Sequence, residues 1–269
     1  EYKADGVIYN QMKFCEYWSY ERVLGVHIVS EEFGIPCIGI PGTIDNDIAS
    51  TDMTIGFDTA MNTVVELVDK LRDTGESHAR CNVVEVMGRE AGDIALNTSI
   101  AVGAVTAVIK EIPTDFEYLF HKMAEARKNG KRNFIIITCE GMGPGYSEQL
   151  CNTIEEKTGI ETRLARLAHV QRGGSPSLRD RVLATQMGCA AVESLVAGQM
   201  KRVVCLRDNS IITMDIHEAL LLDKMMKNTL TPAEREQIAP NALFDMTTRI
   251  AEMLAYKQYL NYIIDHMAL

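Results

Sequence analysis

A regular alternation of short apolar runs with amphipathic stretches limits the folds open to this 269-residue chain. The clearest run, residues 134–138, is a continuous and largely β-branched segment of the kind buried on both faces of a parallel sheet. Between the runs, apolar residues recur at helical spacing, as in residues 58–71 and 180–196. Strands that alternate with helices predict an α/β fold with parallel sheets covered by helices.

The chain divides by sequence character into an atypical N-terminal segment (1–34), an α/β region (35–227) and a helical tail of unknown role (228–269). Further strands are expected at residues 7–9, 37–40, 82–87, 105–109, 161–167 and 203–206. Further helices are expected at residues 20–33, 91–102, 116–128, 147–157 and 216–226, with Ser147 as the N-cap of its helix.

Composition excludes several classes of protein. The formal net charge of -10 argues against a nucleic-acid-binding protein, which would normally carry a basic face. No apolar run approaches the length of a membrane span. The seven cysteines are scattered singly, which favours a reduced, cytoplasmic setting. The chain begins without an initiator methionine or a signal peptide, so we expect a fragment.

An acidic loop follows the expected strand at residues 37–40. It contains Thr43, Asp45 and Asp47, and ligands of open α/β sheets bind just past the carboxyl ends of strands. Two carboxylates with Asn46 between them can bind a divalent ion, orient a hydroxyl or accept its proton. The alternative for this stretch alone is an Asp-rich turn formed for local reasons.

Other polar residues follow later strands: Arg89, Glu140, His169 and Arg172. Arginine suits phosphate because its planar fork makes two parallel charge-assisted hydrogen bonds. Together with the acidic loop, these residues indicate a phosphorylated, hydroxyl-rich substrate at one sheet edge. Taken singly, each arginine is better explained as a surface ion pair and the histidine as a structural residue. We assign no residue as a metal ligand.

Four motifs in this region resemble 6-phosphofructokinase of the ATP-dependent type. They are residues 41–47, 56–60, 85–89 and 169–176, which occur in the family's order, and the resemblance covers residues 34–227. It implies transfer of the γ-phosphoryl group of ATP, with Mg²⁺, to the 1-hydroxyl of fructose 6-phosphate in glycolysis. Gly42, where the pyrophosphate-using branch has lysine, is similar to the ATP-using branch.

The resemblance also implies roles for individual residues. Asp45 matches the catalytic base, and Thr43 and Asp47 match its neighbours in the site. Arg89 matches an arginine that stabilises the transition state and binds the sugar. The remaining matches are to the sugar-phosphate site: Met87, Gly88, Glu140, His169, Arg172, Arg80 and Arg163. The last two would reach the pocket of a neighbouring subunit, so a homo-oligomer is expected. Arg72 matches an allosteric effector-phosphate ligand, whereas Val105 replaces a glutamate near the effector's metal.

The sequence departs from this family at its front. A glycine-rich nucleotide loop and a Gly-Gly-Asp-Gly segment are absent, and residues 9–15 stand in place of the second. We therefore expect a chain truncated at the N-terminus, with impaired nucleotide binding. A non-catalytic sugar-phosphate-binding or oligomerising remnant is the alternative.

Residues 4–37 resemble a segment of 2-hydroxyacyl-CoA dehydratase subunits. This resemblance implies that Cys15 is a thiolate ligand of an iron–sulfur cluster, and it makes a dehydratase component a further alternative. A cluster needs several thiolates, and no companions for Cys15 stand at suitable spacing. A buried cysteine in a strand–helix piece is the simpler interpretation.

Overall fold

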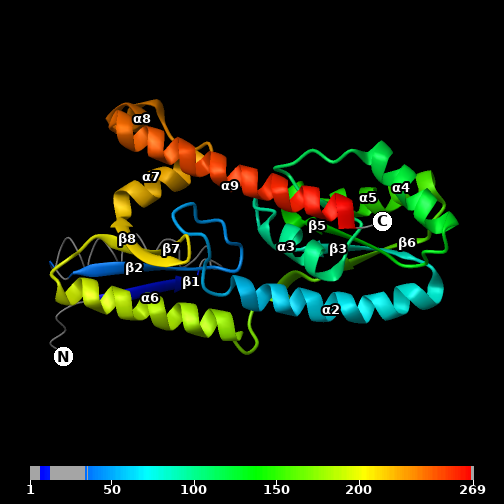
Figure 1. Cartoon of the computed structure of the whole chain (residues 1–269), viewed down its shortest axis with the longest axis horizontal. Coiled ribbons are helices and arrows are strands. Elements are labelled where there is room, and N and C mark those ends of the chain that lie inside the picture. The colour runs from blue at the N-terminus through cyan, green and yellow to red at the C-terminus, as the bar shows by residue number, and fades with distance from the viewer. Residues whose placement is uncertain (1–6, 13–33, 35, 268–269) are drawn as a thin grey trace. The chain divides into compact units, whose positions relative to one another are not determined.

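The structure is a computed structural model that describes residues 7–12, 34 and 36–267 (Figure 1). The chain forms two compact units. The first consists of Glu1–Asp58 and Pro176–Ala251, and the second of Thr59–Ser175 and Glu252–Leu269. Each unit is built on its own four-stranded sheet. The chain passes between them within helix α2 (Phe57–His78), before helix α6 (Leu178–Val196) and within helix α9 (Pro240–Met267).

The sheet of the first unit has the strand order β1-β2-β7-β8. Its strands are β1 (Val7–Met12), β2 (Cys37–Gly42), β7 (Arg202–Arg207) and β8 (Ser210–Asp215). The first three are parallel, and β8 pairs antiparallel with β7. Helix α6 packs on this sheet, and α7 (Ile216–Met226) and α8 (Pro232–Gln237) follow β8.

The sheet of the second unit is entirely parallel, in the order β4-β5-β3-β6. Its strands are β3 (Cys81–Val86), β4 (Thr106–Val108), β5 (Phe134–Cys139) and β6 (Thr162–Arg166). Its helices include α3 (Asp93–Val102), α4 (Phe116–Lys128) and α5 (Tyr146–Thr158), with short 3-10 helices η2 (Glu140–Met142) and η3 (Ala168–Gln171).

The predicted α/β class, with parallel sheets covered by helices, is confirmed. All six residues of β5 are buried, as the continuous apolar run indicated, and Ile136 packs with Met123 of α4 and Ile154 of α5 in the core of the second unit. The predicted bounds of α4 and α7 are those observed. The helix expected at residues 20–33 lies outside the described residues.

Two local predictions were wrong or incomplete. Ser147 is not an N-cap: α5 begins at Tyr146, its N-cap is Gly145 in the left-handed region (φ 75°), and the Ser147 hydroxyl instead donates to the Glu85 carboxylate. Strand β8 was missed. It follows a two-residue turn in which Asp208 and Asn209 both have positive φ (49° and 59°), the geometry that reverses a chain between antiparallel strands.

Five of the described cysteines are buried: Cys37, Cys81, Cys139, Cys151 and Cys205. Burial raises the pKa of each thiol, to about 11 in Cys139 and Cys151. These side chains therefore pack as apolar groups, because a raised pKa disfavours the thiolate that binds metal. Cys189, on α6, is exposed. Cys15 lies outside the described residues. In the same described part of the chain, no helix is long and apolar enough to cross a membrane.

Candidate active site

The acidic loop of the first unit closes on itself directly after β2. The Thr43 amide donates to the Ile55 carbonyl (3.1 Å), and the Ile55 amide donates to the Pro41 carbonyl (3.1 Å). The Thr43 side-chain oxygen accepts the Asp45 amide (3.2 Å). Thr43, Asp45 and Asp47 are all nearly inaccessible, at 2%, 0% and 6% exposure. The three side chains are therefore held in place by the surrounding protein and have little contact with solvent.

Asn46 makes the turn that separates the two carboxylates. Its backbone lies in the left-handed region (φ 53°), which asparagine tolerates better than most residues. Its side-chain oxygen accepts the Thr54 amide (2.9 Å), and its side-chain nitrogen donates to the Asp52 carbonyl (3.2 Å). This local bonding agrees with the turn interpretation of the sequence. The turn also fixes Asp45 and Asp47, as a site would require.

Helices α7 and α9 hold the outer part of this loop within the first unit. Asp223 of α7 accepts the Ala49 amide (3.3 Å). Arg249 of α9 donates to the Ala49 carbonyl (3.2 Å) and pairs with Asp52 (2.6 Å). Lys227, which follows α7, lies 3.7 Å from the Asp47 carboxylate and offsets its charge. The loop is therefore braced at several points, which favours a pre-organised site.

A second group of predicted residues gathers at the carboxyl end of the sheet in the second unit. Gly88 (φ 134°) and Arg89 (φ 53°) form a tight turn after β3, closed by the Ala91 amide donating to the Gly88 carbonyl (2.9 Å). The Arg89 amide donates to the Glu140 carboxylate (3.1 Å). The structure thus brings Arg89 and Glu140 together with their neighbours Met87 and Gly88.

Gln171 joins the His169 turn to this group. Its side-chain oxygen accepts the Met87 amide (3.2 Å), and its side-chain nitrogen donates to the Ala168 carbonyl (3.0 Å). Gln171 is 1% exposed, whereas His169 is exposed and Arg172 is partly buried beside it. Gln171 was part of a recognised motif, but nothing in its residue type indicated that it would link two loops.

One expectation about placement needs correction, and another is confirmed. The polar residues do not surround one sheet edge, because Asp45 follows a strand of one sheet while Arg89, Glu140 and His169 follow strands of the other. Arg80 and Arg163 lie at the opposite end of the second sheet from Arg89, as their sequence positions indicated, with about 20 Å of β3 between Arg80 and Arg89.

Glu161, which sequence reasoning missed, binds both of these distal arginines. Its carboxylate accepts from Arg80 (2.7 Å) and from Arg163. The hydrogen bond from Arg80, with the charges of both arginines, lowers the pKa of Glu161. Arg80 and Arg163 thus form one local cationic pair, here balanced by an acid.

Arg72 lies in α2 of the second unit and donates to the Val102 carbonyl. Burial and the charge of Arg72 lower the pKa of Lys131, so two cations are close together there. Val105 is buried in the core.

The carboxylates of the acidic loop suit a metal that arrives with a phosphate ligand. No three His, Cys, Asp or Glu residues within the described ranges gather into a metal-binding group. Mg²⁺ in phosphate chemistry is commonly held by one or two carboxylates together with phosphate oxygens. Asp45 and Asp47 supply that number of carboxylates in one loop.

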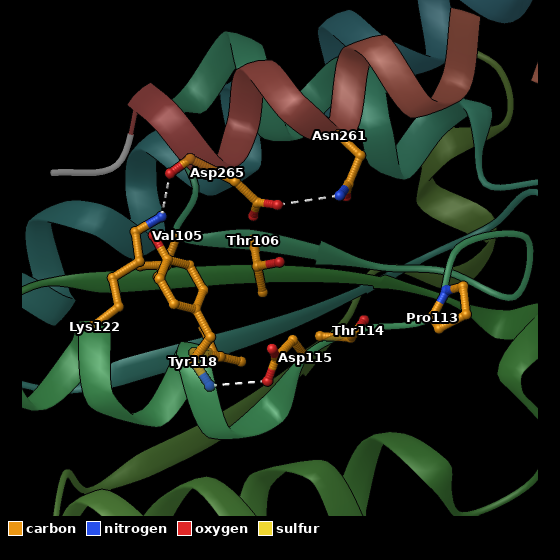
Figure 2. Close-up of a pocket in the computed structure, with 10 residues that line it drawn as sticks. Val105, Thr106, Pro113, Thr114, Asp115, Tyr118, Lys122, Asn261 and Asp265 are labelled. Carbon is orange, nitrogen blue, oxygen red and sulfur yellow. Dashed lines mark hydrogen bonds between the residues drawn. The ribbon is translucent and has the colours of Figure 1, made fainter. Parts of the chain in front are cut away.

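A separate cavity lies in the second unit, between α4 and the last turns of α9 (Figure 2). The Lys122 ammonium donates to the main-chain oxygen of Asp265 (2.7 Å), and burial lowers the pKa of Lys122 and raises that of Asp265. None of the predicted site residues lines the cavity. Its volume of about 120 Å³ is also below the few hundred Å³ of typical ligand sites. It is therefore not the candidate active site.

The architecture is that of an α/β protein with polar loops at the carboxyl ends of its strands, and comparison with known proteins identifies the family. The phosphofructokinase family matches residues 20–195, so the chain belongs to the phosphofructokinase family. This match begins and ends earlier than the 34–227 expected from the motifs, and it overlaps the dehydratase-like segment. The dehydratase-like resemblance of residues 4–37 stays a prediction.

Among its relatives is the ATP-dependent 6-phosphofructokinase of Clostridium tetani, 52% identical over 192 residues, which are 71% of this chain and 60% of that protein. ATP-dependent 6-phosphofructokinase 1 of Clostridium perfringens is 48% identical over 207 residues, 77% of this chain and 64% of that protein. The chain thus spans about three-fifths of the length of these relatives. The solved phosphofructokinase of Saccharomyces cerevisiae superposes with a TM-score of 0.70 at 26% identity, covering 92% of this chain and 32% of that one.

The close approach of the Arg89 turn and the Glu140 loop gives a first prediction. A Cβ on Gly141 would lie 1.9 Å from the Arg89 carbonyl oxygen, a backbone atom that has little room to move. Gly141→Ala is expected to push the two loops apart and to lower the free energy of unfolding by about 1–3 kcal/mol, as overpacking does. Denaturant unfolding measures this change in the free energy of unfolding.

Gly143→Ala is the steric control, because nothing lies within 4 Å of a Cβ there, although its φ of 106° adds backbone strain. Equal stability of Gly141→Ala and the parent chain would contradict the close approach.

Proposed function

We propose that this chain carries the sugar-phosphate part of an ATP-dependent 6-phosphofructokinase, which transfers the γ-phosphoryl group of ATP to the 1-hydroxyl of fructose 6-phosphate in glycolysis. The observation that carries the proposal is the braced acidic loop, with Asp45 and Asp47 fixed on either side of Asn46. Relatives at about half identity bear that enzyme's name. We also propose that the protein is located in the cytoplasm.

In this proposal Asp45 accepts the proton of the attacking hydroxyl. A base must be held within hydrogen-bond reach of that proton, and the bonds around Thr43 and Asn46 supply the fixed geometry. Thr43 and Asp47 orient the reacting groups, and Mg²⁺ bound with ATP would neutralise phosphate charge. Arg89 stabilises the charge of the transition state. Phosphoryl transfer depends mainly on such positioning and charge neutralisation.

The sugar phosphate is assigned to the second group of residues. Glu140 accepts hydrogen bonds from sugar hydroxyls, His169 and Arg172 bind the phosphate, and Met87 and Gly88 shape the site. Arg80 and Arg163 complete a neighbouring copy's pocket, so the active form is a homo-oligomer. Their place at the far end of the sheet from Arg89 supports service to another copy rather than to their own.

Arg72 is assigned to an effector-phosphate site. Its proximity to Lys131 supports this, because two cations held together in a partly buried setting favour an anionic ligand. The buried Val105 offers no carboxylate for an effector's metal.

A non-catalytic sugar-phosphate-binding protein is the second candidate. It is motivated by residues 9–15, which stand where the family resemblance implies a Gly-Gly-Asp-Gly segment. A dehydratase component is less favoured, because five of the six described cysteines pack as buried thiols with raised pKa values.

Thermal unfolding with fructose 6-phosphate tests the proposal. A ligand present at one hundred times its Kd stabilises the folded chain by about 2.7 kcal/mol, so millimolar sugar phosphate is expected to raise Tm. Fructose without phosphate is the control and is expected to leave Tm unchanged. An unchanged Tm with fructose 6-phosphate would contradict sugar-phosphate binding altogether.

Calorimetric titration with Mg·ATP then separates the two candidates. Micromolar binding of the nucleotide favours the kinase. Sugar-phosphate binding without any nucleotide binding favours the non-catalytic protein.

A further inference from the structure

Lys257 of α9 is a buried cation held by two acids of the second unit. Its side chain is 10% exposed, and its ammonium lies 2.5 Å from the Asp93 carboxylate and 2.8 Å from that of Glu111. Burial lowers the pKa of Lys257, but the attraction of Asp93 and Glu111 outweighs burial and raises the pKa above its usual value. Lys257 therefore stays charged.

This ion cluster is joined by hydrogen bonds to the Arg89 turn. The Glu111 oxygen that binds Lys257 also accepts the Gly92 amide (2.8 Å), directly before α3. Gly92 is tightly packed, because a Cβ there would lie 2.7 Å from the Ile109 side chain. The preceding residue, Ala91, closes the turn that carries Arg89. A continuous series of contacts thus runs from Lys257 through Glu111 to the Arg89 backbone.

Removal of the cation would leave the Glu111 carboxylate, whose side chain is 18% exposed, without the ammonium that balances its charge. A buried charge that loses its counter-charge is costly where water is scarce. Glu111 cannot turn toward solvent without releasing the Gly92 amide. The contacts therefore predict movement of the Arg89 turn rather than a purely local change.

We propose that Lys257 is a positioning residue for Arg89, acting through Glu111 and Gly92. The role rests on the proposed function of Arg89. It belongs to α9, which lies wholly beyond the residues that match the phosphofructokinase family, so the family match assigns nothing to it. The tail thereby gains a role in the site.

The test compares Lys257→Met with Gln258→Met. Gln258 is the next residue of α9 and is exposed, so the same new side chain leaves the ion cluster intact. Lys257→Met is expected to lower kcat about 10-fold with little change in KM for the nucleotide, a moderate loss within the range that misplaced groups cause. Lys257→Arg keeps a cation between the two acids and is expected to restore most of kcat. Gln258→Met is expected to match the parent chain.

Hydrogen exchange of the Gly92 amide gives a readout that does not depend on catalysis. Lys257→Met is expected to speed this exchange at least about 10-fold, because the Glu111 acceptor shifts. Should Lys257→Met not fold, Lys257→Gln, which keeps hydrogen-bond donors but no charge, carries the same comparison. Unchanged Gly92 exchange would overturn the proposal. A lowered Tm with unchanged kcat would reduce Lys257 to a structural role. If Lys257→Met speeds exchange of the Gly92 amide but the parent chain has no kinase activity, the result contradicts the proposed function and leaves the contact between Lys257 and the Arg89 turn intact.

Discussion

Asp45→Ser is expected to lower kcat by about 10²–10⁴-fold, the range that a general base contributes. Serine keeps a small polar side chain in the loop but accepts a proton far less readily than a carboxylate. KM for fructose 6-phosphate is expected to change little, because the residues assigned to the sugar phosphate belong to other loops. Steady-state kinetics at saturating substrates measure the effect.

The Asp45 experiment needs a control for the substitution itself. Asp69→Ser places the same change on an exposed position of α2 and is expected to leave kcat at the parent value. Circular dichroism and Tm show whether Asp45→Ser keeps its fold, since Asp45 is fully buried. A folded Asp45→Ser chain with parental kcat would remove Asp45 from the role of base.

Arg80 and Arg163 give the second large prediction, which concerns assembly. In the proposed oligomer, each sugar-phosphate site receives Arg80 and Arg163 from a neighbouring copy. The site of a monomer would lack these two cations. Each charge-assisted hydrogen bond to phosphate contributes about 1.5–3 kcal/mol. Since about 1.4 kcal/mol is tenfold in affinity, their loss is expected to weaken sugar-phosphate binding at least about 100-fold. Binding is therefore expected to strengthen as protein concentration rises and oligomers form.

Calorimetry and sedimentation across a dilution series measure this dependence. Arg163→Ala is expected to weaken binding without changing the fold, whereas Arg235→Ala, on the exposed surface of α8, is expected to change neither. Glu161→Gln is informative because Glu161 binds both arginines within the chain and would compete with a phosphate. It is expected to strengthen binding. Tight binding by a chain that stays monomeric at every concentration would refute the shared site.

The parts of this protein that could be predicted from sequence are those with a local physical signal. The apolar run of β5 indicated a buried parallel strand, and helical spacing gave the bounds of α4 and α7. The acidic loop was predicted because turn residues and carboxylates occur together directly after a strand. In each case neighbouring residues determine the structure.

The missed features depend on residues far apart in the chain. Arg249 pairs with Asp52 across 197 positions, and Lys257 with Asp93 across 164. Each looks in sequence like an ordinary surface cation of a helix. Gln171 was missed for the same reason, since its contact with Met87 spans 84 positions. The division of the candidate residues between two sheets was missed because strand periodicity does not reveal which strands pair.

The distribution of thiols described above has a practical consequence for experiments on this protein. Cys189 is exposed on α6, while the other described cysteines are shielded and have raised pKa values. Maleimide dyes react with accessible thiolates, so a Cys15→Ser background would carry one reactive site in the native chain. The shielded thiols would react only after unfolding. Counting modified sulfurs by mass spectrometry would then report, in one measurement, the fraction of molecules that have opened.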